Sequence, residues 1–192
     1  YSTTASNNTA VGYQAGYNNT AEEITAFGVA ALYTNTTGTY NTGIGRGALY
    51  GNTTGGSNTA VGRQALASNT TASNNTAVGY LAGYSNTTGS PITAVGYAAM
   101  YSNTTGTNNA AFGRLALYTN STANDNTALG DAAMYSNSTG TGNVAVGRQT
   151  LYNNTTASYN TATGAFALLN ITTGGYNTAV GYTALFTTTT TT

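Results

Sequence analysis

Arginine and tyrosine side chains recur at one fixed spacing in this chain, and their chemistry suits ligand binding. The 192 residues include 16 Tyr and four Arg, with no Lys, and the formal net charge is zero. Aromatic faces stack on sugar rings, and guanidinium groups bind acidic groups in pairs of hydrogen bonds. We expect an exposed stripe that binds cell-surface glycans, or alternatively one that only keeps a charge-poor surface soluble. The stripe comprises Tyr13, Arg46, Arg63, Tyr80, Tyr97, Arg114, Arg148 and Tyr182.

A second recurring pattern is Asn followed by Thr or Ser and then Thr, which is an acceptor pattern for N-linked glycans. The same residues are typical of a turn in which the Asn side chain binds nearby backbone groups. Both interpretations stay open from the sequence, and Thr-linked glycans are a further form of the first. The candidate glycosylation sites are Asn35, Asn52, Asn69, Asn86, Asn103 and Asn120.

Residues suited to catalysis are nearly absent. The chain contains no His and no Cys, which excludes an imidazole base, a thiolate nucleophile and a zinc site of these ligands. Glu22 and Glu23 are the only adjacent acids, and neighbours along a strand point to opposite faces rather than across a cleft. We therefore expect no enzyme, no metal, no cofactor and an irregular loop at the two glutamates. Four Arg cannot neutralise a run of phosphates, so we expect no nucleic-acid partner.

These residues are positioned by an internal repeat. An idealised unit reads N-T-A-V-G-Y-Q-A-L-Y-S-N-T-T-G-S-N, and we number its repeat positions 1 to 17 from the first Asn. The first interval between the glycines at repeat position 5 is 16 residues and the other nine are 17, with no Lys after them, so they indicate corners rather than a phosphate loop. These corner glycines are Gly12, Gly28, Gly45, Gly62, Gly79, Gly96, Gly113, Gly130, Gly147, Gly164 and Gly181.

The repeat predicts an all-β fold, a parallel β-solenoid or β-roll of 17-residue coils. Thr, Asn and Gly disfavour helix, and the unit divides into a strand at repeat positions 2 to 4, the Gly corner, a second strand at 6 to 10 and a turn. Stacked coils place like residues about 4.8 Å apart. The large apolar side chains at repeat positions 4 and 9 are expected to face the core, and repeat position 6 is expected to face solvent. The aromatic residues at repeat position 10 fit either a buried Tyr ladder with its hydroxyls at the rim or an exposed ligand-binding stripe.

Each coil offers only two large apolar side chains and one Tyr to the expected core. The free energy gained by burying them is small beside the backbone entropy lost when one coil becomes ordered. We therefore expect chains to share a core, intertwined or packed as a parallel homotrimer. The repeat array spans residues 1–186 as a single domain, and 187–192 form a Thr-only tail that is a linker or a continuation of other sequence. The chain has no apolar run long enough to enter a membrane, and it reads as a fragment of a longer protein.

Units such as "NTAVGYQAGY", "NTAVGRQALA", "NTAVGYLAGYSNTTGS" and "NTALGDAAMYSNSTG" resemble two groups of proteins. One is the head repeat of trimeric autotransporter adhesins, whose shorter units carry "S-V-A-I-G" or "S-T-A-L-G". The other comprises repeat arrays of tail-fibre-like proteins of phages and environmental bacteria. The resemblance covers about Asn8 to Phe186 and implies a trimeric β-roll, identical chains as partners and a place outside the cell, on its surface or on a virion.

Composition, repeat and resemblance together predict a structural fibre or adhesin shaft that attaches to a cell or surface without catalysis. One alternative is a self-assembling, glycosylated extracellular filament, in which uncapped coil ends stack on one another. Another alternative is an ice-binding β-solenoid, because regular Thr and Asn ladders can order water.

Overall fold

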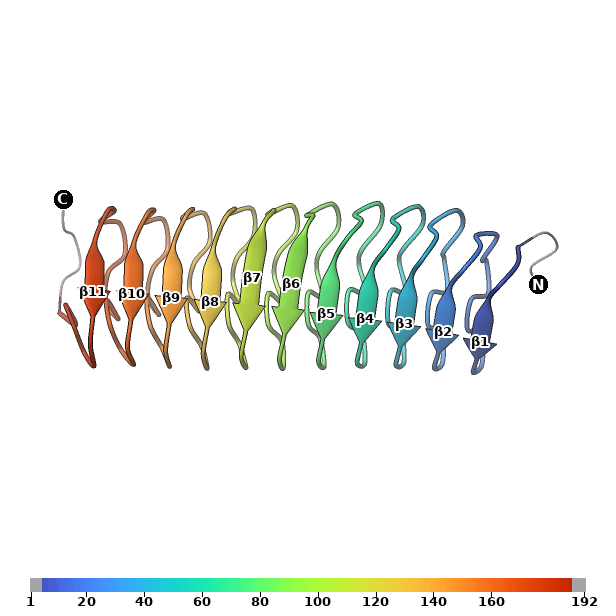
Figure 1. Cartoon of the computed structure of the whole chain (residues 1–192), viewed down its shortest axis with the longest axis horizontal. Coiled ribbons are helices and arrows are strands. Elements are labelled where there is room, and N and C mark those ends of the chain that lie inside the picture. Colours follow the sequence, from blue (N-terminus) through green and yellow to red (C-terminus); the bar gives the residue numbers. More distant parts are fainter. Residues whose placement is uncertain (1–4, 188–192) are drawn as a thin grey trace.

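The computed structural model describes residues 5–187 and shows a rod of stacked coils (Figure 1). Within these residues there is no helix, and eleven strands form one parallel sheet in sequence order. This confirms the predicted parallel β-solenoid. The strands are β1 (Thr9–Val11), β2 (Thr25–Phe27), β3 (Thr42–Ile44), β4 (Thr59–Val61), β5 (Thr76–Val78), β6 (Ile92–Val95), β7 (Asn109–Phe112), β8 (Thr127–Leu129), β9 (Val144–Val146), β10 (Thr161–Thr163) and β11 (Thr178–Val180).

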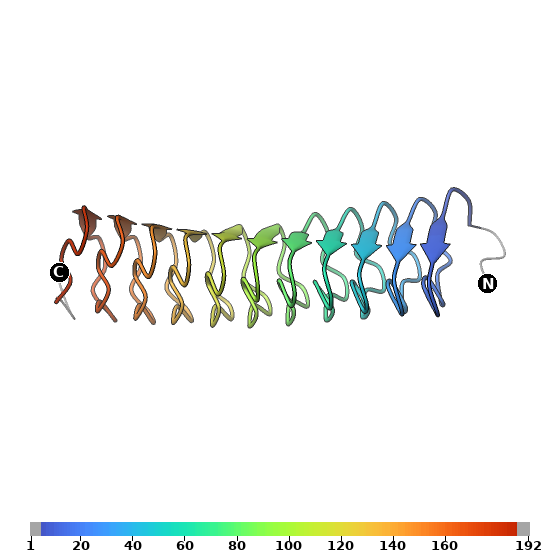
Figure 2. The ribbon, with the colours of Figure 1, turned by 90° about the horizontal axis from the view of Figure 1, so that it is seen from below.

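Successive coils lie in register, so that like residues stack on like. In the pairing of β3 with β4, Thr42 lies beside Thr59 and Ile44 beside Val61. We number the coils 1 to 11 after the strand that each contains. Ten steps at the usual strand spacing of about 4.8 Å give a shaft of roughly 50 Å. Figure 2 shows the strands of this shaft turning gradually from one end to the other, as parallel strands do.

The predicted second strand is wrong. Each coil has a single strand, and repeat positions 6 to 11 form a series of tight turns. In coil 4, Gln64 and Leu66 have φ of 58° and 49°, in the left-handed region. Their coil still bonds to its neighbours, since the Leu66 N–H donates to the Ala82 carbonyl at 3.0 Å. The hydrogen-bonded stack therefore continues without extended backbone.

The corner glycine is required both by its backbone conformation and by the closeness of the next coil. Gly45 has φ of +127°, which residues with a side chain rarely adopt, and a Cβ placed on it would lie 2.6 Å from the Gly62 carbonyl oxygen. Neighbouring corners repeat this geometry along the rod. The prediction that the glycines mark corners of close backbone approach is confirmed.

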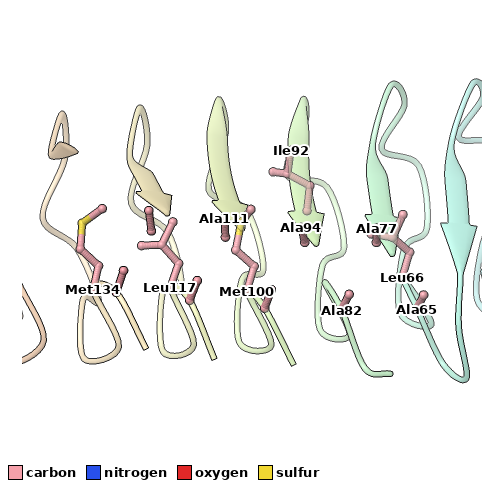
Figure 3. Close-up of a cluster of buried hydrophobic side chains, with 14 of the residues drawn as sticks. Ala65, Leu66, Ala77, Ala82, Ile92, Ala94, Met100, Ala111, Leu117 and Met134 are labelled. Atoms are coloured by element: carbon pink, nitrogen blue, oxygen red, sulfur yellow. The ribbon is translucent and has the colours of Figure 1, made fainter. Parts of the chain in front are cut away.

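The core lies between the strand and the turn of each coil and is lined by Ala and, in most coils, by one or two larger side chains (Figure 3). Ala60 and Ala77 at repeat position 3 are fully buried, as are Leu66 and Met100 at repeat position 9. Repeat position 9 thus faces the core as predicted. This core closes within one chain, so the buried side chains need no second chain to cover them.

Repeat position 4 faces solvent, and the prediction that it lines the core is wrong. Phe27, Ile44 and Val78 are 54%, 38% and 37% exposed, respectively. Side chains alternate across a strand, so burial of the Ala at repeat position 3 sends its neighbour outward. The narrow space under the strand is filled from the turn by Leu or Met, which leaves room for only a methyl group. Residue size alone therefore misassigned this position.

Two ladders of Asn side chains complete the interior. At repeat position 12, Asn86 Nδ2 donates to Asn69 Oδ1 at 3.0 Å and to the Gly89 carbonyl at 3.0 Å, while its Oδ1 accepts from Asn103 Nδ2 at 2.8 Å. At repeat position 1, Asn58 Nδ2 donates to Asn41 Oδ1 at 3.1 Å. The Nδ2 of each buried Asn donates to a neighbouring coil or to its own turn.

The repeat-position-12 ladder ends where an apolar residue replaces Asn. Ile171 occupies this position in coil 10, and the buried Oδ1 of Asn154 in the coil before it lacks a hydrogen-bond partner within the described part of the chain. Each rung of the ladder thus depends on an amide in the next coil.

Replacing Asn86 by Leu is expected to lower the free energy of unfolding by about 3 kcal/mol, because three buried hydrogen bonds of about 1 kcal/mol each are lost. Asn86 Nδ2 no longer donates to Asn69 Oδ1 and the Gly89 carbonyl, and Asn103 Nδ2 no longer donates to Asn86 Oδ1. Urea unfolding followed by circular dichroism measures the loss. Thr88→Ala is the matched control in the same turn, since Thr88 is exposed and should change the unfolding free energy by less than about 0.5 kcal/mol. Equal midpoints for Asn86→Leu and the wild type would contradict a structural role for the ladder.

Candidate surface-binding stripe

The residues at repeat position 6 follow the corner glycine directly, and the turn projects them away from the core. All eight members of the predicted stripe are exposed, from 37% for Tyr80 to 74% for Tyr182 among its tyrosines. The prediction that repeat position 6 faces solvent is confirmed. Because each member belongs to a different coil, the stack aligns them along one side of the rod.

Several members of the stripe interact with one another or with a neighbouring ring. Tyr80 stacks on Tyr97 with ring centroids 5.4 Å apart, and the Arg63 guanidinium lies 5.5 Å from the Tyr80 ring centre. Arg114 Nη2 donates to Asp131 Oδ2 at 3.2 Å. The 2.8 Å approach of Arg114 Nε to Asp131 Oδ1 is an ion-pair contact without hydrogen-bond alignment.

The tyrosines at repeat position 10 form a second aromatic row beside this stripe. Their rings stack at centroid distances of 5.1 to 5.2 Å and are half-buried to exposed, so one edge packs on the rod and the other meets solvent. Ala67 interrupts the row in coil 4. The two runs of stacked rings are Tyr17, Tyr33, Tyr50 and Tyr84, Tyr101, Tyr118, Tyr135, Tyr152.

Burial and neighbouring tyrosines perturb the acidity of one phenol in the middle of the longer run. Burial raises the pKa of the Tyr118 phenol above its ordinary value, and the phenolates that would form at Tyr135, Tyr101 and Tyr97 raise this pKa further. The neutral phenol is therefore the form that the folded chain stabilises.

The raised pKa of Tyr118 predicts that the contribution of this phenol to folding stability is constant below pH of about 10 and falls as pH rises through the higher folded-state value. The folded state holds the phenol proton more tightly than the unfolded state, so alkali favours unfolding. Urea unfolding at successive pH values measures this, with the tyrosinate absorbance as the titration signal. No Lys, Cys or His contributes to the titration.

Tyr118→Phe removes the titrating group while keeping the ring, and should flatten part of the alkaline fall in stability. A fall of the same size in the variant and the wild type would show that Tyr118 is not its source.

The six predicted N-glycosylation sites are fully buried in the amide ladder at repeat position 12, where each side chain donates to one neighbouring coil and accepts from the other. Asn52 Nδ2, for instance, donates to Asn35 Oδ1 at 2.7 Å and to the Gly55 carbonyl at 2.9 Å. A glycan would replace one of the two hydrogens on this nitrogen and so remove one of these bonds, and it could not fit inside the coil. For the folded chain, the acceptor interpretation of Asn35, Asn52, Asn69, Asn86, Asn103 and Asn120 is corrected, and the turn interpretation holds.

The exposed hydroxyls of these turns belong to repeat position 14. The Thr or Ser at repeat position 13 bonds to the next coil, as Thr53 Oγ1 does with the Thr70 carbonyl at 3.0 Å. Repeat position 14 is Thr in every full-length turn of the described residues and faces solvent each time. These residues are Thr37, Thr54, Thr71, Thr88, Thr105, Thr122, Thr139, Thr156 and Thr173.

Glu22 and Glu23 are exposed in the shortened turn of coil 1. Ser6 Oγ donates to Glu22 Oε1 at 3.2 Å, and Glu23 has a left-handed φ of 58°. No group of three His, Cys, Asp or Glu side chains within residues 5–187 is placed to hold a metal ion. Nor does any helix of those residues have the length and apolarity to cross a membrane. The predicted tail begins at Thr187, and its remainder, residues 188–192, lies outside the described residues.

Sequence reasoning missed the outward face of the sheet as a candidate site. Apolar side chains at repeat position 4 form a row on it that only Thr163 of coil 10 interrupts within the described residues. It is flanked by a row at repeat position 2 that is mostly Thr and half-buried to exposed. Neither row contains a charged residue. The sequence N-T-A-V holds the signal that could have revealed this face. Side chains alternate along a strand, so if Asn and Ala point inward, Thr and Val point outward.

No family model, curated protein or solved structure matches the chain. The resemblance to autotransporter heads and tail-fibre repeats therefore stays a prediction.

Proposed function

We propose that this chain is a shaft segment of a fibre outside the cell, on its surface or on a virion, and that it attaches to a cell or surface without catalysis. One observation carries the proposal: eleven in-register coils follow one another without interruption across the described residues. Each coil adds the same hydrogen bonds to its neighbour, so extension preserves stiffness. The exposed stripe at repeat position 6 supplies the attachment surface.

We further infer that identical chains associate side by side through the sheet face, most simply as a parallel homotrimer. The row at repeat position 4 runs the length of the rod, from Val11 at 48% exposed to Val180 at 73%. A long uncharged apolar strip on a surface is typical of an interface with another protein.

A second copy of the chain is the partner whose spacing matches this row. The exposed side chains recur once per coil, at about 4.8 Å. Only a surface with the same period keeps its side chains in step with them over the full shaft. The Thr row at repeat position 2 favours the alternative of ice binding. However, the strands turn gradually along the rod in Figure 2, so this row does not form the flat surface that would match an ice lattice.

The triple variant Ile44→Lys, Val78→Lys and Phe112→Lys tests the association, because it adds like charges to the sheet face at exposed positions. The wild type is expected to sediment at a multiple of 19.3 kDa and the variant at 19.3 kDa, with equal circular dichroism. Thr54→Lys, Thr88→Lys and Thr122→Lys place the same charges in the same coils at repeat position 14, and should sediment as the wild type does. A monomeric wild type at high protein concentration would sink the inferred association.

The shaft role is tested by duplicating coils 2 to 10, residues 24–176, in tandem. Electron microscopy should show rods longer by about 43 Å, which is nine further coils at the strand spacing. Fluorescent rods should be retained on glycan-coated beads and not on bare beads. Bent or branched particles, or lengths that do not follow the number of coils, would overturn the proposed function.

A further inference from the structure

A depression of about 420 Å³ lies on the side of the rod across coils 2 to 5, between repeat positions 6 and 10. It occurs where the sequence departs from the repeat on both sides. Its lining includes two Arg, two Tyr and several small residues. These are Val29, Ala30, Arg46, Gly47, Tyr50, Arg63, Gln64, Ala67, Ser68 and Tyr84.

One side of the depression is the place of a missing ring. Ala67 occupies the rung between Tyr50 and Tyr84, which each end a run of stacked tyrosines. Adjacent rungs elsewhere are 5.2 Å apart. Two rungs therefore separate these rings by about 10 Å, and a ring placed midway lies at a stacking distance of about 5 Å from each.

The floor of the depression is open because small residues occupy repeat position 7. Coils 2 and 3 have Ala30 and Gly47 there, whereas coil 4 has Gln64 and coil 5 has Leu81. A Cβ placed on Gly47 would meet only Gln64 Cγ, at 3.5 Å. Gly47 is itself buried with Gln64 beside it, so the small residues at repeat position 7 deepen the depression without exposing the backbone.

The opposite side carries two arginines in neighbouring coils at the same repeat position. Arg46 and Arg63 are exposed, and neither has an ion pair among the described residues. The Arg63 guanidinium lies 5.5 Å from the Tyr80 ring centre, and an anion that lies between Arg46 and Arg63 is attracted by both positive charges. By contrast, Arg114 has Asp131 in the adjacent coil as its counter-charge.

We propose that this depression binds a sugar ring that carries a carboxylate or a sulfate. The ring fills the rung at Ala67 between Tyr50 and Tyr84, and its acidic group lies between Arg46 and Arg63. Gln64 and Ser68, which also line the depression, suit the sugar hydroxyls. The proposal deepens the attachment role inferred for repeat position 6 and rests on it.

The second break in the aromatic row lacks these features. In coil 10, Leu169 occupies repeat position 10 and Ala165 occupies repeat position 6. A Leu side chain fills the rung, and no cation pair faces it. The combination of an empty rung and paired arginines thus distinguishes coils 3 and 4 from coil 10.

Ala67→Tyr tests the proposal without weakening the fold, because the new ring completes the aromatic row. Titration calorimetry with a galacturonate hexamer and with a heparin-derived hexasaccharide compares the carboxylate and the sulfate on the wild-type chain. The wild type should bind at least one of the two hexasaccharides, and its affinity for that hexasaccharide should fall as the salt concentration rises. Ala67→Tyr should lose at least about tenfold in affinity, equivalent to about 1.4 kcal/mol, while its melting temperature is unchanged or higher.

Arg46→Gln and Arg63→Gln should each lose about tenfold in affinity for the bound hexasaccharide. Thr54→Gln, which places the same side chain at exposed repeat position 14 of the coil that contains Arg46, should bind as the wild type does. Cellohexaose, which is uncharged, should bind at least tenfold more weakly. Binding by naphthalene sulfonate in place of both acidic sugars would overturn the assignment to a sugar. Unchanged affinity in Ala67→Tyr would overturn the site.

These outcomes are separable from those of the proposed function. If rods lengthen with coil number and are retained on glycan-coated beads, but neither acidic hexasaccharide binds, only this site is wrong. If Ala67→Tyr abolishes hexasaccharide binding while rods fail to scale in length, the site stands and the shaft role falls.

Discussion

The whole structure depends on the contact between each coil and the next at the corner glycine. There the backbones approach so closely that a Cβ on Gly45 would lie 2.6 Å from a carbonyl oxygen of the next coil. One coil can keep this distance only if its neighbour adopts the same conformation. The constraint therefore propagates along the chain, and it fixes the register of every other repeat position, including the stripe that faces solvent.

The same closeness makes the core thin and partly polar. Methyl groups of Ala and amides of Asn occupy space that larger apolar side chains fill in an ordinary domain, and the amide ladder offsets the lost burial by satisfying buried polar groups. Inside the coil, large apolar side chains fit only at repeat position 9 and where Ile24, Ile92 or Ile171 replaces a ladder Asn. The other large apolar residues have no room there. They collect on the outer face of the sheet, which links the geometry of the coil to the proposed association of chains.

The sequence was sufficient to predict the stacking, the corner glycines and the outward place of repeat position 6, because these follow from the period and from what Gly, Arg and Asp tolerate. The sequence was not sufficient to predict that turns replace the second strand. Leu66 and Gln64 adopt left-handed conformations against their usual backbone preferences, and hydrogen bonds to adjacent coils hold them there. The role of the Asn residues was ambiguous, because the pattern of Asn followed by Thr or Ser and then Thr is typical of both a glycan acceptor and a turn with an amide ladder. Only burial separates the two.

A perfectly regular solenoid offers the same surface at every coil, so a site that holds one ligand in one place must come from departures from the repeat. Ala67 removes a ring, Gly47 removes a side chain, and Arg46 beside Arg63 leaves two positive charges without an acidic neighbour. None of these residues disturbs the corner or the amide ladder, which are the parts that neighbouring coils require to be identical. The fold thus tolerates specialisation at repeat positions 6, 7 and 10, and local recognition can arise on a shaft whose stiffness requires uniformity elsewhere.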